Sequence, residues 1–226
     1  MRIKKKKGKW IVKLLKVVVT VYLLLILCQL IADAYTRLSV THNITVSEEW
    51  NLIVVNRCNE LTEDYSVELT ELSNGQKVDS RIYPYLQEMF DAARAEGVYP
   101  VVREGYRTEE EQREILDDKI QTYINQGYSQ SRAERTAKEW VALPGTSEHQ
   151  LGIAVDINAD KSMYSNEEVY AWFAENAHKY GFILRYPPGK QEITGTSYEP
   201  WHYRYVGIEA AYEINERGIC LEEYFE

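Results

Sequence analysis

Side chains that can bind a metal cluster in two short stretches of this 226-residue sequence. The first contains His149 and, seven residues later, Asp156. The second contains Glu199, followed three residues later by His202. A single histidine more often has a structural role, but the chain has only four, and each of these two has a carboxylate close by in the sequence. Two imidazoles and two carboxylates can supply three ligands to Zn²⁺ and leave one carboxylate as a general base.

The elements predicted around the first stretch would hold its side chains on rigid backbone. Residues 153–157 have the continuous apolar pattern of a buried strand, and this strand would carry Asp156. Gly152 permits a sharp turn immediately before it. His149 is therefore expected on the loop that leads into the strand.

The second stretch is expected to place His202 on another strand of the same sheet. Residues i and i+3 of a regular strand face opposite sides of the sheet, so Glu199 and His202 would point apart on an uninterrupted strand. Pro200 lies between them and breaks regular strand geometry. Both side chains can then face one site.

A third candidate group lies at the start of a predicted helix, Glu109–Asn125. Thr108 is the expected N-cap, and Glu111 completes a capping box. Arg107 precedes this cap, and a guanidinium beside a helix N-terminus makes a strong anion site, to which Gln112 could add an amide donor. The alternative is that Arg107 is an ordinary surface residue next to a helix cap.

The rest of the chain is expected to interleave helices with short strands, which indicates an α+β domain with a small, mostly antiparallel sheet. Hairpin-like returns are expected near Gly195 and Gly207. The apolar spacing predicts helices at residues 79–97, 130–141 and 166–180, and strands at residues 50–55, 99–103 and 182–186.

The two metal-binding stretches are similar to the motifs of a known peptidase family. The patterns S-x-H-x-x-G-x-A-x-D, at residues 147–156, and E-x-W-H-x-x-Y, at residues 199–205, resemble the VanY-type D-alanyl-D-alanine carboxypeptidases. That family consists of zinc peptidases that act on cell-wall peptides. The resemblance extends from about Leu52 to the C-terminus, and it implies the fold shared with hedgehog signalling domains, with helices flanking the sheet.

The resemblance implies zinc-assisted removal of the C-terminal D-alanine from peptidoglycan stem peptides. His149, Asp156 and His202 are the expected Zn²⁺ ligands, and Glu199 is the expected base that takes a proton from the attacking water. The H-E-x-x-H pattern of helix-borne zinc proteases does not occur in the sequence.

The resemblance also implies an arginine that contacts the substrate. The family motif G-Y-R-S corresponds to residues 105–108, where Thr108 replaces the usual Ser and Glu104 precedes the motif at a position where a small residue is common. Arg107 is expected to stabilise either the carboxylate of the terminal D-alanine or the developing oxyanion. The remaining expected substrate contacts are Gln112, Ser147 and Tyr186.

Two other classes of function remain open at this point. A non-catalytic, zinc-stabilised binding domain would hold zinc without hydrolysis, and a cell-wall endopeptidase would need a groove open at both ends. An arginine able to grip a terminal carboxylate favours the carboxypeptidase. The sequence leaves open whether the enzyme cleaves D,D- or L,D-bonds, and whether it serves antibiotic resistance or routine wall maturation.

The N-terminal region predicts a membrane anchor. Residues 1–16 carry eight Lys or Arg and no acid, and an apolar run follows. We expect a single-pass protein of the cell membrane with its catalytic domain outside the cytoplasm; cleavage of a signal peptide after Ala34 is the alternative. The expected parts are a basic cytoplasmic tail at 1–9, a transmembrane anchor at 10–32, a spacer at 33–48 and the carboxypeptidase domain at 49–226.

Charge and cysteine content set limits on partners. Removing the eight N-terminal basic residues from the 26 Lys and Arg leaves 18 against 35 Asp and Glu, a balance of −17 for residues 17–226. Such a body is not expected to bind nucleic acid. We expect a monomer. Cys58 and Cys220 could form a disulfide outside the membrane or remain free thiols.

Overall fold

The computed structural model describes residues 20, 49–62, 65–160 and 165–225. The chain divides into two units, Met1–Ile44 and Thr45–Glu226, and every described residue except Thr20 belongs to the second. The expected tail, anchor and spacer therefore lie outside the described residues, apart from Thr20. No helix among the described residues is both long and apolar enough to cross a membrane.

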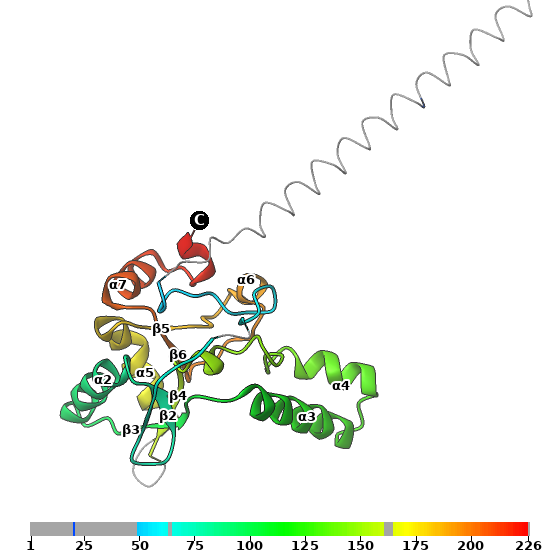
Figure 1. The fold of residues 1–226 in the computed structure, drawn as a ribbon, viewed down its shortest axis with the longest axis horizontal. Coiled ribbons are helices and arrows are strands. Elements are labelled where there is room, and N and C mark those ends of the chain that lie inside the picture. The colour runs from blue at the N-terminus through cyan, green and yellow to red at the C-terminus, as the bar shows by residue number, and fades with distance from the viewer. Residues whose placement is uncertain (1–19, 21–48, 63–64, 161–164, 226) are drawn as a thin grey trace, which may run out of the picture. The chain divides into compact units, whose positions relative to one another are not determined.

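A four-stranded antiparallel sheet with the order β3-β4-β6-β5 forms the centre of the second unit (Figure 1). Its strands are β3 (Pro100–Glu104), β4 (Ala154–Ala159), β5 (Phe182–Leu184) and β6 (His202–Tyr205). A separate hairpin pairs β1 (Leu69–Glu71) with β2 (Lys77–Asp79). The α+β class with a small antiparallel sheet is confirmed.

Helices α2 and α5 pack on this sheet and bury most of the apolar core. Apolar residues of α2 (Tyr83–Ala95) recur with helical spacing at Leu86, Met89, Phe90 and Ala93, and all four are buried. The core face of α5 (Asn166–Asn176) includes Phe173, whose ring meets that of Phe90 edge to face at 5.8 Å. The chain ends with α6 (Gln191–Thr194), α7 (Ile208–Arg217) and a 3₁₀ turn at Glu222–Phe225.

Helix α3 (Glu109–Asn125) contributes little to the core. It buries only Gln112 and Leu116, and it packs against α4 (Gln130–Ala137) on the side of the molecule away from α2, α5 and α7 (Figure 1). The predicted capping box is present, because Thr108 accepts a hydrogen bond from the Glu111 amide and Glu111 accepts one from the Thr108 amide. The free inner face of α3 is therefore available to line a site.

Several predicted elements are wrong in detail. The strand expected at residues 50–55 does not form, because the guanidinium of Arg204 takes up the carbonyls of Asn51 and Ile53 that a partner strand would use. The returns at Gly195 and Gly207 are not hairpins. Gly195, at φ +73°, ends α6, and Gly207, at φ +86°, precedes α7.

Three predicted helices are shorter than expected. Helix α2 spans Tyr83–Ala95 instead of residues 79–97, α4 ends at Ala137, and α5 ends at Asn176, after which a 3₁₀ turn continues to Tyr180. The glycine that follows this turn, Gly181, has the left-handed conformation predicted for a helix cap. Cys58 is exposed and Cys220 is buried, and both are free thiols, so no disulfide joins these two described cysteines.

Candidate active site

Pairing of β4 with β6 brings two of the predicted metal ligands together. Asp156 and His202 are direct partners in the antiparallel register. His149 lies in a 3₁₀ turn, Glu148–Leu151, which ends at Gly152 with φ +73°. A Cβ at Gly152 would lie 3.1 Å from the Asp79 amide nitrogen, so only glycine lets the chain turn here into β4.

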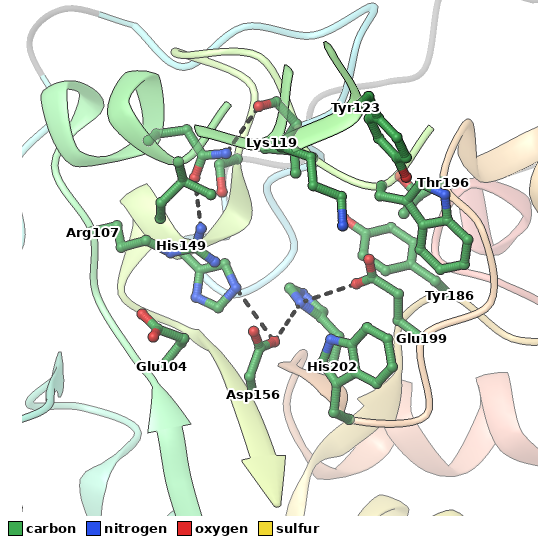
Figure 2. Close-up of a pocket in the computed structure, with 17 residues that line it drawn as sticks. Glu104, Arg107, Lys119, Tyr123, His149, Asp156, Tyr186, Thr196, Glu199 and His202 are labelled. Carbon is green, nitrogen blue, oxygen red and sulfur yellow. Dashed lines mark hydrogen bonds and ion pairs between the residues drawn. The ribbon is translucent and has the colours of Figure 1, made fainter. Parts of the chain in front are cut away.

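The three predicted ligands converge on one point (Figure 2). The Asp156 Oδ1 atom lies 3.0 Å from His202 Nδ1 and 3.5 Å from His149 Nε2. One potential ligand atom from each of the three residues lies within 4.8 Å of the other two. Sequence reasoning predicted this set, and the structure brings its members together.

A second partner orients each imidazole. His149 Nδ1 lies 2.7 Å from the Gly105 carbonyl oxygen, to which it can donate, so that Nε2 faces Asp156. In His202 the nitrogen that faces Asp156 is Nδ1, because Nε2 lies 3.5 Å from Glu148 Oε2. Partners of this kind fix the tautomer and ring orientation of metal-binding histidines.

The donor set fits a divalent metal such as Zn²⁺. Asp156 Oδ1 is buried and makes no hydrogen bond to any described residue, although two imidazoles lie beside it. Burial by itself would raise the pKa of Asp156, but His149 and His202 lower it well below its usual range. An ionised, buried carboxylate oxygen and two imidazole nitrogens are three ligands, the number that the protein supplies in tetrahedral zinc sites with an open fourth position.

Glu199 lies beside the ligands but outside β6, as the prediction from Pro200 required. Its Oε2 atom is 3.8 Å from His202 Nδ1, and its amide donates to the Tyr186 carbonyl. Burial raises the pKa of Glu199 to about 7, against the lowering effect of His202. A carboxyl group with a pKa near neutrality can both accept and release a proton at physiological pH.

Arg107 lies on the opposite side of the cluster, next to His149 (Figure 2). Its amide donates to the His149 carbonyl, and its Nη1 donates to Gln112 Oε1 at 3.0 Å. The amide nitrogen of Gln112 donates to the Ala142 carbonyl at 2.9 Å. Both ends of the buried Gln112 amide are thus engaged within the protein, where the side chain positions Arg107. The expected contact of Gln112 with substrate stays a prediction.

These residues line one cavity of about 620 Å³. The predicted residues Ser147 and Tyr186 also line it, and both are buried; the Tyr186 ring lies 4.9 Å from that of His202. Glu104 lines the same cavity, and no ion pair joins it to Arg107 within the described part of the chain. The other lining residues, none of them predicted as a site residue, are Ile115, Lys119, Tyr123, Trp140, Val141, Ala142, Thr196 and Trp201.

A buried ionic network, also missed, lies directly behind His202. Glu148 accepts hydrogen bonds from Arg185 at 2.7 Å and from Arg204 at 2.8 Å. Arg185 also donates two hydrogen bonds to Glu222, at 2.9 and 2.6 Å. All four side chains are at most 5% exposed. The network fixes Glu148, which in turn faces His202, one of the three predicted metal ligands.

Comparison with known proteins identifies the family. A family model described as VanY, D-alanyl-D-alanine carboxypeptidase, matches residues 75–208. The chain belongs to the VanY family. It is 60% identical over 177 residues to a D-alanyl-D-alanine carboxypeptidase of Enterococcus faecalis, covering 78% of this chain and 66% of that protein. It is 44% identical to the putative carboxypeptidase YodJ of Bacillus subtilis, covering 62% of this chain and 50% of that protein.

Solved VanY structures have the same fold as this chain. A variant of the vancomycin resistance D,D-pentapeptidase VanY in complex with Zn(II) matches with a TM-score of 0.78 and 60% identity, over 79% of this chain and 100% of that one. The LD-carboxypeptidase LdcB matches with a TM-score of 0.65 and 37% identity, over 82% of this chain and 86% of that one. The predicted family is confirmed.

Proposed function

We propose that this protein is a zinc-dependent carboxypeptidase that removes the C-terminal D-alanine from peptidoglycan stem peptides. The observation that carries the proposal is one cavity holding a three-ligand metal cluster, a carboxyl group with a pKa near 7 and an arginine on the far side of the cluster. A related VanYB structure, 61% identical with a TM-score of 0.77, is a complex with D-alanine-D-alanine. That complex supports the same substrate class here.

His149, Asp156 and His202 would hold the zinc ion. When bound, zinc supplies Lewis acidity, which polarises a scissile carbonyl and lowers the pKa of water. The structure of a related VanY with Zn(II) supports this choice of metal.

Glu199 moves the protons. Its carboxylate takes a proton from the attacking water and delivers that proton to the leaving amine of D-alanine. Burial raises the pKa of this carboxyl group to about 7, so both its ionised and its protonated form are populated near neutral pH.

Arg107 grips the terminal carboxylate of the substrate. Its planar guanidinium can bind a carboxylate through two parallel hydrogen bonds. Gln112 holds one nitrogen of the guanidinium from behind. An enzyme that needs this carboxylate cleaves the last peptide bond, which favours a carboxypeptidase over an endopeptidase.

Cleavage of D,D-bonds is favoured over L,D-bonds by the degree of similarity. The D,D-pentapeptidase VanY is 60% identical to this chain, whereas the LD-carboxypeptidase LdcB is 37% identical. The proposed substrate is therefore the pentapeptide stem that ends in D-alanyl-D-alanine. The presence of both Glu199 and Arg107 in the cavity argues against a non-catalytic binding domain.

Mass spectrometry of peptide products tests the function. The zinc-loaded protein should shorten a pentapeptide stem by one alanine and leave a tetrapeptide stem intact. Removal of zinc with a chelator should stop the reaction, and added Zn²⁺ should restore it. An intact pentapeptide after long incubation would refute the function, while cleavage of the tetrapeptide alone would transfer the assignment to an L,D-carboxypeptidase.

A further inference from the structure

The cavity continues past the metal ligands to a second cation. Among the residues that line it, Arg107 and Lys119 are the only ones with basic side chains other than histidine. Figure 2 shows Arg107 beside His149 and Lys119 on the other side of the ligand cluster, near Tyr123, Tyr186 and Glu199. A peptide held by Arg107 at its C-terminus and crossing the metal site would run toward Lys119.

Helix α3 forms this wall of the cavity with one face. Its lining residues follow helical spacing, at positions 112, 115, 119 and 123. Lys119 lies seven residues beyond Gln112, which holds Arg107, and this corresponds to about 10 Å along the helix axis. An extended peptide covers about 10 Å in three residues. Lys119 is therefore placed to meet a substrate about three residues before its terminal carboxylate.

The Lys119 ammonium has no carboxylate partner within the described part of the protein. No ion pair involves Lys119 there, and its ammonium lies 5.6 Å from the centre of the Tyr123 ring. Its helical neighbours at i±3 and i±4 are Ile115, Leu116, Thr122 and Tyr123, none of them acidic. Arg113 on the same helix, in contrast, pairs with both Glu109 and Glu110.

We propose that Lys119 and the surrounding aromatic side chains form a subsite for a second carboxylate of the substrate, on the N-terminal side of the scissile bond. This inference rests on the proposed function. Stem peptides carry such a group as the α-carboxyl of their γ-linked D-glutamate, and a further one where the third residue is diaminopimelate. In a protein whose body carries a large negative charge, a lone half-buried lysine in the substrate cavity is suited to select an anionic peptide.

Two matched pentapeptide stems test the subsite, both with lysine as the third residue. One has the free α-carboxyl of D-glutamate and the other has its amide. Wild-type enzyme should show a KM about ten-fold lower for the free acid, the scale of one charge-assisted contact. Lys119→Gln should raise KM for the free acid by a similar factor and leave KM for the amidated stem unaffected. Lys179→Gln, which removes an exposed lysine far from the cavity, is the control.

A second pair of stems, with free or amidated diaminopimelate in place of lysine, separates the two sources of the carboxylate. A Lys119-dependent preference within the first pair assigns the subsite to D-glutamate, and within the second pair to diaminopimelate. Equal effects of Lys119→Gln on acid and amide in both pairs would overturn the subsite while leaving the proposed function intact. Failure of the wild type to release D-alanine from any stem would instead refute the proposed function.

Discussion

Glu199 lies 3.8 Å from His202, one of the three proposed metal ligands, but the roles proposed for Glu199 and for the ligands can be separated by substitution. Replacement of His149 by Ala removes a ligand, so zinc and activity should be lost together. Glu199→Ala removes only the proton carrier. It should keep near-stoichiometric zinc and lose about 10²- to 10⁴-fold in kcat. Metal analysis of the folded variants alongside turnover checks both, and near-normal turnover by Glu199→Ala would disprove its role as the base.

Arg107 is predicted to recognise the terminal carboxylate through the geometry of its guanidinium. Arg107→Lys keeps the charge but loses the bidentate contact and the hydrogen bond to Gln112. It should lower kcat/KM by a factor equivalent to a loss of about 1 to 3 kcal/mol of transition-state stabilisation. Amidation of the substrate C-terminus should harm the wild type similarly, and the two changes together should be less than additive. Full additivity would mean that Arg107 serves the oxyanion.

At the scale of elements, the network behind β5 and β6 predicts a pH-dependent stability. Burial by itself would raise the pKa of Glu222, but Arg185 lowers it below its ordinary value of 4.5. A carboxyl group with a depressed pKa in the folded state stabilises the fold above its unfolded pKa, and that contribution is lost as the pH falls through the folded pKa. The network should therefore weaken below about pH 4.5.

Glu222→Gln isolates this contribution. At pH 7 it should cost about 3 kcal/mol of unfolding free energy, because it leaves Arg185 partly uncompensated in a buried site. The difference from the wild type should shrink between about pH 5 and pH 3. Urea unfolding at a series of pH values measures it. The control Glu213→Gln breaks a half-exposed pair with Arg217 and should cost less than about 1 kcal/mol. A pH-independent loss in Glu222→Gln would contradict the assignment.

The sequence predicted those parts of the site that have local signals. His149, Asp156, Glu199 and His202 were identifiable from two short motifs, and the start of α3 from its capping box. Lys119 was not predicted, because nothing in the sequence shows which face of α3 lines the cavity.

The buried network had no such signal. Glu148 meets Arg185, Arg204 and Glu222 only after β5, β6 and the C-terminal turn have packed together. The wrong prediction of a strand at residues 50–55 has the same cause, a contact between segments far apart in the sequence. Its apolar pattern is real, but a side chain from β6, some 150 positions later, binds its backbone. Contacts of this range cannot be predicted from residue spacing.

For the whole molecule, the charge asymmetry predicts a membrane topology. Eight basic residues precede the apolar run, which favours an N-terminus in the cytoplasm and a catalytic domain outside. A phosphatase reporter that is active only outside the cytoplasm, fused after residue 226, should be active, and a cytoplasmic reporter at the same place should not. Substituting the basic residues with Ser or Gln should reduce the orientation bias. Activity of the cytoplasmic fusion in the parent protein would exclude an exported enzyme.

The buried arginines also bear on when the site forms during synthesis. Arg204 binds backbone near residue 51, and Arg185 binds Glu222. Segments from both ends of the domain are thus held by these two neighbouring guanidinium groups. Until Glu222 has emerged, Arg185 lacks part of its counter-charge, and a buried charge without its partner is costly. The nascent chain is therefore expected to stay short of its native packing until Glu222 has left the ribosome. A stop codon just before Glu222 would yield a protease-sensitive product despite an intact set of metal ligands.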